Sequence, residues 1–394
     1  MTMSSLFHSL RVRSVEPDTS EAMIVSFEVP PELRQVFGFT QGQYLTLRKQ
    51  IDGQDLRRSY SICAGVDDGE LRVGVRKVRD GLFSNWIHAR LQPGDEISVM
   101  APQGRFFVPI EPAARRHHVG IAGGSGITPI LSIMKTVLAR EPLSSFTLVY
   151  GNRALRSTMF KEEIEDLKNK YMTRLVLHHV FSDEQTERSD GPQVALLPPP
   201  EGVKSGLGAA RRPDLPLSMG QMNRAKIAEF LGSVLPATDI DHAYVCGPFQ
   251  MNDEAEAALL AAGVPEARIH IERFGIAPSG NEAPGAPVGA VIHEAKPGDA
   301  EQARVVSSRD GLRREFEFRK DQPSILDAAS AAGLEVPFSC TSGVCGTCRA
   351  KLIEGEVRME RNFALDKAEV AAGFVLTCQA HPLTERVVLS FDDR

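Results

Sequence analysis

The amino-acid sequence predicts a multidomain protein: an antiparallel β-barrel, then an α/β domain built on a parallel sheet, then a small α+β domain. Apolar and polar residues alternate up to about residue 110, after which strand-like runs alternate with helical ones. Four of the six cysteines cluster between positions 340 and 378, which sets the C-terminal part apart. A chain of 394 residues is also too long for one compact core, so two or three domains are expected.

Residues 1–110 are expected to form the barrel. Their apolar residues alternate with polar ones in short runs that Gly, Pro and Asp separate. This pattern is typical of antiparallel strands with one buried face. The predicted strands are 22–29, 43–49, 70–78 and 95–101.

Residues 117–274 are expected to form the α/β domain, because strands alternate with helices as in βαβ units. The predicted strands are 117–123, 146–152, 174–181, 242–247 and 268–274. The predicted helices are 127–140, 159–171, 225–235 and 251–263. A Pro- and Gly-rich stretch at about 185–222 interrupts the alternation, and we expect it to be a surface insertion.

The C-terminal part begins with a linker. Residues 275–300 are rich in Gly, Pro and Ala, a composition typical of a solvated tether. Residues 301–394 then form the last domain, with strands expected at 303–308 and 314–320 and a short helix at 324–333. A domain of about ninety residues is small enough to profit from a stabilising metal centre.

Composition and charge exclude several classes of function. Lys and Arg number 45 against 51 Asp and Glu, and the net charge of −6 gives no reason to expect nucleic acid or an anionic membrane as a partner. No run approaches the roughly 20 apolar residues of a membrane-spanning helix, and the N-terminus has no secretory or organellar pattern. We therefore expect a cytoplasmic protein whose partners are small molecules or other proteins.

Four cysteines have a spacing that indicates metal chemistry. They are Cys340, Cys345, Cys348 and, after a long gap, Cys378. In a reducing cytosol such clustering favours metal ligation or redox chemistry over disulfides. The spacing is typical of plant-type [2Fe–2S] centres, and Gly343 and Gly346 would let backbone N–H groups reach the sulfurs. A four-cysteine zinc site is the alternative, although structural zinc usually takes its ligands from two short pairs.

The segments CTSGVCGTC and LTCQA make the last domain resemble plant-type ferredoxins. The resemblance implies a β-grasp fold and a one-electron carrier of low potential, around −400 mV for the type. A one-electron carrier performs no chemistry on a substrate. The rest of the chain is therefore expected to supply its electrons.

A glycine turn joins the first strand of the α/β domain to its first helix. Gly123, Gly124 and Gly126 would let backbone amides and the helix N-terminus approach a pyrophosphate, with Thr128 and Pro129 opening the helix. The strict dinucleotide fingerprint is absent, and such turns are common for other reasons.

A second turn, Cys246-Gly247-Pro248, ends a later strand of the same domain. In an open α/β sheet ligands bind at the carboxyl ends of the strands, so both turns would line one crevice. Burial as a small apolar side chain is the alternative for Cys246.

Two segments of the barrel carry groups that suit a flavin. Arg58, Tyr60 and Ser61 place a cation, a flat ring and a hydroxyl at the end of a strand, where they can hold a phosphate and cover an isoalloxazine. Ordinary alternation in an exposed strand is the alternative. Gly81 and Ser84 lie at a turn before an expected helix and suit a second phosphate contact.

In chain order, the segments RSYS, DGLFSNW, GGSGITP, YGNR and CGPFQM resemble the ferredoxin–NADP reductase superfamily. Together with the ferredoxin-like end, nearly the whole chain is similar to the reductase components of bacterial oxygenases. The resemblance implies FAD in the barrel, NAD(P)H in the α/β domain and a [2Fe–2S] cluster at the C-terminus. It also implies an oxygenase or epoxidase component as the electron acceptor.

The resemblance assigns roles to the motif residues. It implies that Arg58, Tyr60, Ser61, Gly81 and Ser84 bind the flavin. It implies that Gly123, Gly124, Gly126 and Thr128 meet the phosphates of the nicotinamide cofactor, and that Cys246, Gly247 and Pro248 lie beside the nicotinamide. Cys246 and Tyr60, at the two reacting rings, are accordingly the candidate catalytic residues.

The chain departs from the family pattern at two positions. Asp80 stands where many members have a second glycine, and Asp183 stands where members that prefer NADPH often have arginine. An acidic residue at position 183 would accept hydrogen bonds from a ribose diol and repel a 2′-phosphate, which favours NADH. Arg188, or Arg211 and Arg212 in the insertion, are the alternative that would favour NADPH.

The expected reaction converts a two-electron donor into a one-electron donor. A nicotinamide gives up a hydride whereas the cluster takes one electron, so a flavin must stand between them. The linker would let the ferredoxin-like domain visit the flavin and then an outside acceptor.

Two kinds of alternative interpretation are open: a different electron acceptor, or a different class of function. The acceptor can instead be a ring-hydroxylating oxygenase, a steroid hydroxylase or a hybrid-cluster protein. A redox-sensing flavin and iron–sulfur protein is the alternative of another class, and it predicts bound cofactors with negligible NAD(P)H turnover.

Overall fold

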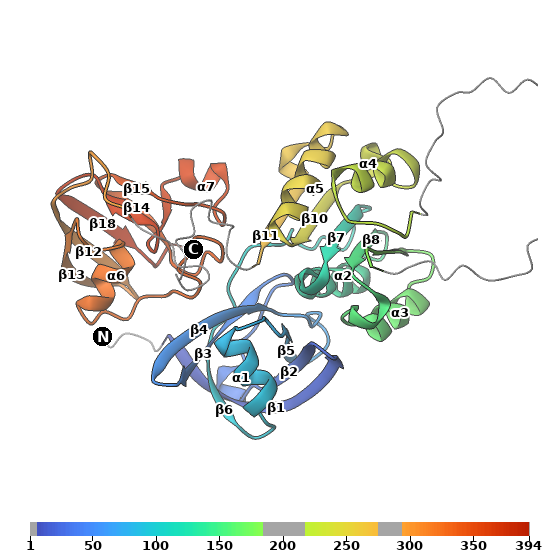
Figure 1. Ribbon diagram of the computed structural model, residues 1–394, viewed down its shortest axis with the longest axis horizontal. Helices are drawn as coiled ribbons and strands as arrows, with labels where there is room; N and C mark the ends of the chain where they lie inside the picture. The colour runs from blue at the N-terminus through green and yellow to red at the C-terminus, as the bar shows by residue number, and fades with distance from the viewer. Residues whose placement is uncertain (1–5, 184–216, 275–293, 394) are drawn as a thin grey trace, which may run out of the picture.

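The computed structural model of the chain describes residues 6–183, 217–274 and 294–393. Figure 1 shows a barrel in blue, an α/β domain in green and yellow, and a third domain in orange and red. The predicted fold class is confirmed. Most of the predicted insertion at about 185–222 and of the predicted linker 275–300 lies outside the described residues.

Six antiparallel strands form the first domain, in the order β4-β3-β6-β1-β2-β5. They are β1 Phe7–Thr19, β2 Ala22–Glu28, β3 Tyr44–Ile51, β4 Gln54–Ser61, β5 Leu71–Arg76 and β6 Glu96–Met100. A bridge between Ile62 and Val73 joins the two outermost strands and closes the sheet. Asp52 and Gly53, both with positive φ, make the two-residue hairpin between β3 and β4, and helix α1 spans Leu82–Arg90.

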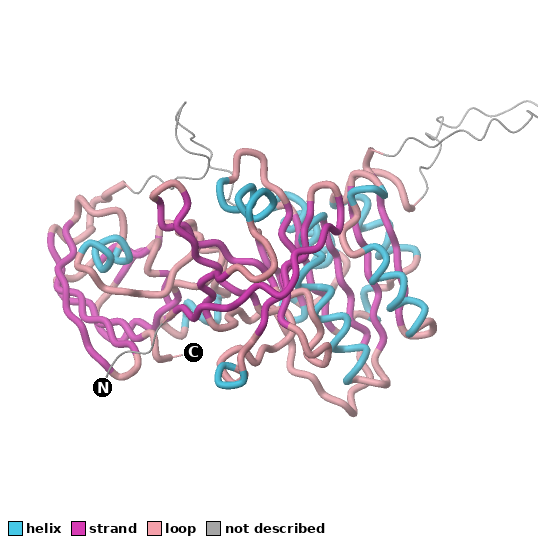
Figure 2. Tube along the Cα trace, turned by 90° about the horizontal axis from the view of Figure 1, so that it is seen from below, coloured by secondary structure: helices cyan, strands magenta, loops and turns pink. Residues whose placement is uncertain are grey.

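Five parallel strands form the second domain, in the order β11-β10-β7-β8-β9. They are β7 His117–Gly123, β8 Ser145–Asn152, β9 Leu175–Phe181, β10 His242–Gly247 and β11 Ile269–Arg273. The helices are α2 Ile127–Arg140, α3 Lys161–Lys170, α4 Arg224–Ser233 and α5 Phe249–Ala261. Apolar residues of α2 and α3 pack in one core, and those of α4 and α5 in another, so helices cover both faces of the sheet. In Figure 2 these helices flank the strands as separate layers.

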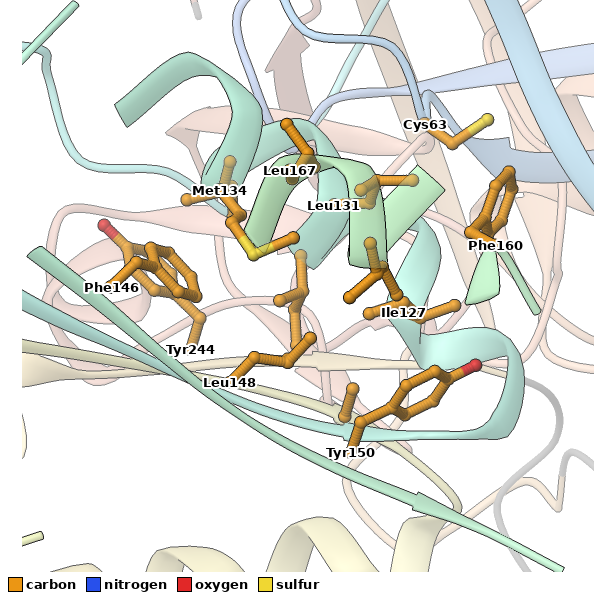
Figure 3. Close-up of a cluster of buried hydrophobic side chains, with 14 of the residues drawn as sticks. Cys63, Ile127, Leu131, Met134, Phe146, Leu148, Tyr150, Phe160, Leu167 and Tyr244 are labelled. Atoms are coloured by element: carbon orange, nitrogen blue, oxygen red, sulfur yellow. The ribbon is translucent and has the colours of Figure 1, made fainter. Parts of the chain in front are cut away.

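The core beneath α2 also ties this domain to the barrel. Figure 3 shows Leu131 and Met134 above Leu148 of β8, with Cys63 of the barrel at the edge of the same cluster. The hydroxyl of Ser132 donates to the backbone oxygen of Ala64 at 2.7 Å. Ala22, Cys63 and Phe106 of the barrel thus belong to the same apolar core as α2, while the interior of the barrel forms a core of its own.

Helix α3 begins two residues later than the sequence predicts. Phe160 adopts a left-handed conformation with φ 55°, which no α-helix tolerates in its first turn. Its backbone N–H donates to both carboxylate oxygens of Asp18, at 3.0 and 3.1 Å. This contact with the barrel fixes where the helix starts.

A mixed five-stranded sheet forms the third domain, in the order β13-β12-β18-β14-β16. Its strands are β12 Gln302–Arg309, β13 Leu312–Arg319, β14 Arg349–Glu354, β16 Phe374–Leu376 and β18 Arg386–Ser390, and β15 Val357–Met359 pairs with β17 Ala380–Pro382. Strands β12 and β18 run parallel, and helix α6 Ile325–Ala331 packs against the apolar core. Helix α7 spans Lys367–Ala371. No helix among the described residues is long and apolar enough to cross a membrane.

Candidate functional site

The two predicted turns of the α/β domain meet at the carboxyl ends of β7 and β10. A Cβ atom added to Gly126 would lie 2.0 Å from the backbone oxygen of Cys246, and one added to Gly247 would lie 2.4 Å from the Cε of Met251. Gly123 also abuts Met251, at 2.6 Å from a built Cβ to Sδ. Glycine is therefore required at position 126, where the two turns touch backbone to backbone, whereas Gly123 and Gly247 abut the flexible side chain of Met251.

Thr128 and the helix N-terminus complete the first turn. Thr128 is buried, and its hydroxyl donates to the backbone oxygen of Ser125 at 3.0 Å. The short 3₁₀ turn Gly124–Gly126 leads directly into α2, so the free N–H groups of the helix end point out of the turn. An anion at this place would meet backbone N–H groups rather than the Thr128 hydroxyl.

Ser61, Cys246 and Glu272 bring the barrel and the α/β sheet together. The Ser61 hydroxyl donates to a carboxyl oxygen of Glu272 at 3.1 Å, and Cys246 is the register partner of Glu272 in the neighbouring strand. Desolvation raises the pKa of Glu272 to about 8. It also raises the pKa of the fully buried Cys246 thiol well above its usual value. At neutral pH both groups therefore hold their protons.

Glu272 is not among the site residues that the sequence predicts. Its strand, 268–274, is predicted, but a single acid in an alternating strand looks like an ordinary exposed residue. Glu272 keeps part of its surface accessible, yet its carboxyl group is desolvated and meets a hydroxyl from another domain. That pairing depends on how the domains pack, so no local sequence pattern reveals it.

The predicted flavin residues lie on both faces of β4. Tyr60 packs beside Phe83, with ring centroids 6.2 Å apart, and burial raises the pKa of its phenol. Arg58 is exposed, and its guanidinium donates to the backbone oxygen of Arg57 at 2.7 Å. Ser61 lies on the opposite face of the strand and is buried. The strand thus offers a cation, a ring and a hydroxyl at one end of the barrel.

Gly81 and Ser84 lie at the start of α1. The Ser84 hydroxyl accepts from the backbone N–H of Val78 at 3.1 Å and is buried. Asp80 precedes the pair with φ 59°, in the left-handed region. Asp is one of the few residues other than Gly that enters this region readily, so the turn keeps its shape without a second glycine.

The four cysteines of the third domain form two pairs. Cys340 is hydrogen-bonded to Cys345, and Cys348 to Cys378. This bond lowers the pKa of Cys340 and raises the pKa of Cys345. A two-iron cluster takes two cysteines at each iron, whereas the ligands of one ion converge on one point.

Backbone N–H groups also reach the sulfurs of this loop. Ser342 N lies 3.4 Å from Cys340 Sγ, and Thr347 N lies 3.5 Å from Cys345 Sγ. Both glycines of the loop have positive φ, 79° and 70°, which turns the backbone N–H groups inward. Hydrogen bonds to the sulfurs stabilise the negative charge of an iron–sulfur cluster. The donor set therefore fits a [2Fe–2S] cluster.

A groove of about 1730 Å³ runs along the carboxyl ends of β8 and β9. Arg153, Arg156 and Lys161 line it from the α/β domain and Arg76 lines it from the barrel, while Asp183 and Glu21, which is ion-paired with Arg76 at 3.1 Å, add two negative charges. Such a basic groove suits a phosphorylated ligand. The three arginines at 188, 211 and 212 that would favour NADPH lie outside the described residues.

Three family models match the chain in order. The oxidoreductase FAD-binding domain matches residues 9–108, the oxidoreductase NAD-binding domain residues 121–195, and the 2Fe-2S iron-sulfur cluster binding domain residues 308–383. The sequence-based prediction of FAD, NAD(P)H and [2Fe–2S] sites is thereby confirmed at the level of domains.

Curated relatives cover almost the whole chain. It is 39% identical to a component of the 1,2-phenylacetyl-CoA epoxidase of Escherichia coli (strain K12), over 98% of both chains. It is 31% identical to the ferredoxin reductase component of 3-ketosteroid-9-alpha-monooxygenase of Rhodococcus rhodochrous, over 97% of this chain and 96% of the relative. Among solved structures, phthalate dioxygenase reductase is similar in fold over 98% of both chains, with 24% identity and a TM-score of 0.54.

Proposed function

The chain belongs to the flavin- and iron–sulfur-containing oxygenase reductases of the ferredoxin–NADP reductase superfamily, and from this premise we propose that its electron acceptor is a phenylacetyl-CoA epoxidase. It is an NAD(P)H-dependent oxidoreductase, the reductase component of an oxygenase system. The 39% identity with an epoxidase component, against 31% with a steroid monooxygenase reductase of similar coverage, supports this acceptor and a role in phenylacetate catabolism.

One observation carries the proposed chemistry: Ser61 of the barrel is hydrogen-bonded to Glu272 of the α/β sheet, beside Cys246. A flavin bound by the barrel supplies the conversion of a two-electron donor into a one-electron donor. The protein must bring the nicotinamide against that flavin, and the only residues needed are those that bind, orient and exclude water. Ser61, Cys246 and Glu272 are neutral polar groups at the junction where the two rings must meet.

The remaining site residues follow from this arrangement. We assign Arg58, Tyr60, Gly81 and Ser84 to the flavin and the turns at Gly123–Gly126 and Gly247–Pro248 to the nicotinamide cofactor. We assign the four cysteines of the third domain to the cluster. Their paired thiols and inward N–H groups support this assignment.

The nucleotide preference rests on the groove beside β9. Asp183 favours the ribose diol of NADH, and the basic side chains of the same groove favour an additional phosphate. We keep NADH as the proposed donor on the strength of Asp183, with NADPH as the alternative. We also propose domain limits of 1–110, 117–274 and 301–394, and a cytoplasmic location, where the cluster thiols stay reduced.

The test uses purified holoprotein and both nucleotides. Anaerobic addition of NADH or NADPH should bleach the overlapping flavin and iron–sulfur absorption within one turnover, and the faster nucleotide is the donor. Addition of the phenylacetyl-CoA epoxidase oxygenase component, substrate and air should then give epoxide formation. The oxygenase component of a steroid hydroxylase serves as the matched acceptor control.

Each outcome separates one interpretation from the others. If NAD(P)H reduces the protein but electron transfer is faster to the steroid oxygenase, the assignment as a reductase stands and the proposed acceptor is wrong. Bound cofactors that neither nucleotide reduces would favour the redox-sensing alternative, because that interpretation predicts ligand binding without turnover.

A further inference from the structure

The third domain rests on one face of the hairpin formed by β3 and β4. Figure 1 shows this hairpin beside the third domain. Residues that alternate along the two strands make the contacts: Arg48 Nη1 lies 3.5 Å from Glu335 Oε1, and the hydroxyls of Ser59 and Ser339 are 2.9 Å apart. Because side chains on one face of a strand recur every second residue, Tyr44 and Ser61 belong to this face as well.

Tyr44 makes the contact that reaches the cysteine loop itself. Its phenol donates to the backbone oxygen of Cys345 at 2.5 Å and lies 3.0 Å from the hydroxyl of Thr347. The Thr347 hydroxyl in turn lies 3.1 Å from Cys345 Sγ. Tyr44 is only 5% exposed, so water does not compete for these bonds.

The direction of the hydrogen bonds follows from the chemistry of a cluster ligand. As a ligand, Cys345 is a thiolate and can only accept, so the Thr347 hydroxyl must donate its proton to the sulfur. The single proton of the Tyr44 phenol is then shared between two acceptors, the backbone oxygen of Cys345 at 2.5 Å and the oxygen of Thr347 at 3.0 Å. A continuous chain of donors thus runs from the barrel to a sulfur of the cluster.

Tyr44 also lies next to the proposed flavin site. Tyr44 and Ser61 are directly opposite each other in the antiparallel pair of β3 and β4, and Ser61 is bonded to Glu272. Cross-strand partners on one face have neighbouring side chains. One pair of residues therefore connects the nicotinamide side of the barrel with the cluster side.

We propose that Tyr44 is a positioning residue that fixes the cysteine loop against the flavin barrel and, through Thr347, raises the reduction potential of the cluster in this docked arrangement. The proposal rests on the assignment of this chain as an iron–sulfur reductase. Hydrogen bonds to cluster sulfurs favour the more negative, reduced state and so raise the potential. A donor supplied by the barrel makes the cluster a better electron acceptor while it faces the flavin.

The test replaces the phenol and keeps the ring. In Tyr44→Phe, anaerobic redox titration of the holoprotein should give a lower potential for the cluster and an unchanged potential for the flavin. The electron paramagnetic resonance signal of the reduced cluster should shift as well. Loss of one hydrogen bond should also weaken docking by roughly 2- to 10-fold. Tyr171→Phe, which removes a phenol at the end of α3, is the matched control and should change neither property.

A second pair of variants keeps the proposal testable if Tyr44→Phe loses its cluster. Thr347→Ser retains the hydroxyl and should keep the wild-type potential, whereas Thr347→Ala should lower it, and adding Tyr44→Phe to Thr347→Ala should lower it little further. Equal cluster potentials in wild type, Tyr44→Phe and Thr347→Ala would overturn the inference. A wild-type protein that NAD(P)H does not reduce would instead refute the proposed function, so the two failures are distinguishable.

Discussion

At the residue scale, Glu272 makes the stability of the protein depend on pH. Its folded-state pKa is raised to about 8 from the ordinary value of 4.5, so between these values the folded chain keeps a proton that the unfolded chain releases. Stability is therefore greatest below the unfolded value and falls as the pH rises towards 8. In Glu272→Gln this fall should be smaller, because the amide cannot ionise.

Urea denaturation at about pH 6 and about pH 9 measures this difference. The midpoint should drop more between the two pH values in the wild type than in Glu272→Gln. Glu28→Gln, at the exposed end of β2, is the control and should follow the wild type. Parallel curves for wild type and Glu272→Gln would mean that this carboxyl group is not desolvated in solution.

Asp183 is the second residue that carries a prediction. Its carboxylate lines the groove that Arg153 and Arg156 make basic. Asp183→Asn removes the charge that repels a 2′-phosphate and keeps a hydrogen-bonding side chain, so the ratio of kcat/KM for NADPH to that for NADH should rise, by about tenfold for roughly 1.4 kcal/mol. Stopped-flow reduction of the flavin with each nucleotide checks it. An unchanged ratio would place the ribose elsewhere in the groove.

Whether a site residue can be found from the sequence depends on whether its partners are close to it in the sequence. The four cysteines and the glycine turns were singled out from the sequence, because ligand spacing and turn chemistry depend on a few neighbouring positions. Glu272 and Tyr44 were not, because their partners Ser61 and Cys345 are 211 and 301 positions away and come from other domains. Burial of an acid or a phenol at such a junction depends on domain packing.

At the element scale, the contact between the β7 turn and β10 carries a prediction. In Gly126→Ala the new methyl would lie 2.0 Å from the Cys246 oxygen, so the turn or the strand must move. We expect a loss of stability of about 1–3 kcal/mol and weaker nucleotide binding. Gly232→Ala in α4 is the matched control, because its methyl meets nothing within 4 Å and should stabilise the helix by about 0.5–1 kcal/mol. Urea denaturation and nucleotide titration measure both.

The strands and helices of the first two domains show which elements the periodicity of apolar residues predicts and which boundaries it misses. Alternation located β2, β3, β5 and β6 of the barrel and the strands of the parallel sheet, because burial on one or both faces leaves a direct trace in the sequence. The long strand β1 was not predicted. The predicted start of α3 was wrong by two residues, because a tertiary hydrogen bond from Phe160 to Asp18 overrides the helical pattern.

Equal stability of Gly126→Ala and wild type would contradict the prediction for this turn, because it would show that the turn contact yields more easily than its geometry indicates.

At the scale of the whole molecule, the order of domains was predictable but their contact was not. Motifs fix which domain binds which cofactor, whereas the docking of the third domain on β3 and β4 depends on surface pairs such as Arg48 with Glu335. Both side chains are partly exposed, so this ion pair contributes little on its own. The docked arrangement therefore depends more on the buried bond of Tyr44 to Cys345 than on such surface pairs.

A reversible crosslink tests whether the third domain must leave the barrel. The hydroxyls of Ser59 and Ser339 are 2.9 Å apart, so Ser59→Cys with Ser339→Cys should form a disulfide between the two domains. In the oxidised double variant, NAD(P)H should still bleach the cluster, because the docked arrangement is the one that receives electrons. Delivery to the oxygenase component should fall strongly and return after mild reduction, since the docked face covers the loop at Cys345.

The single variant Ser59→Cys, treated with the same oxidant and reductant, controls for damage to the cluster, and iron content is compared in every sample. Full delivery by the crosslinked protein would show that the acceptor reaches the cluster from the side opposite the barrel. In that case the docked arrangement at Tyr44 would be permanent, with the flavin on one side of the cluster and the acceptor on the other. Lost delivery would make docking at Tyr44 the first of two alternating positions, because the same loop cannot face the flavin and the oxygenase at once.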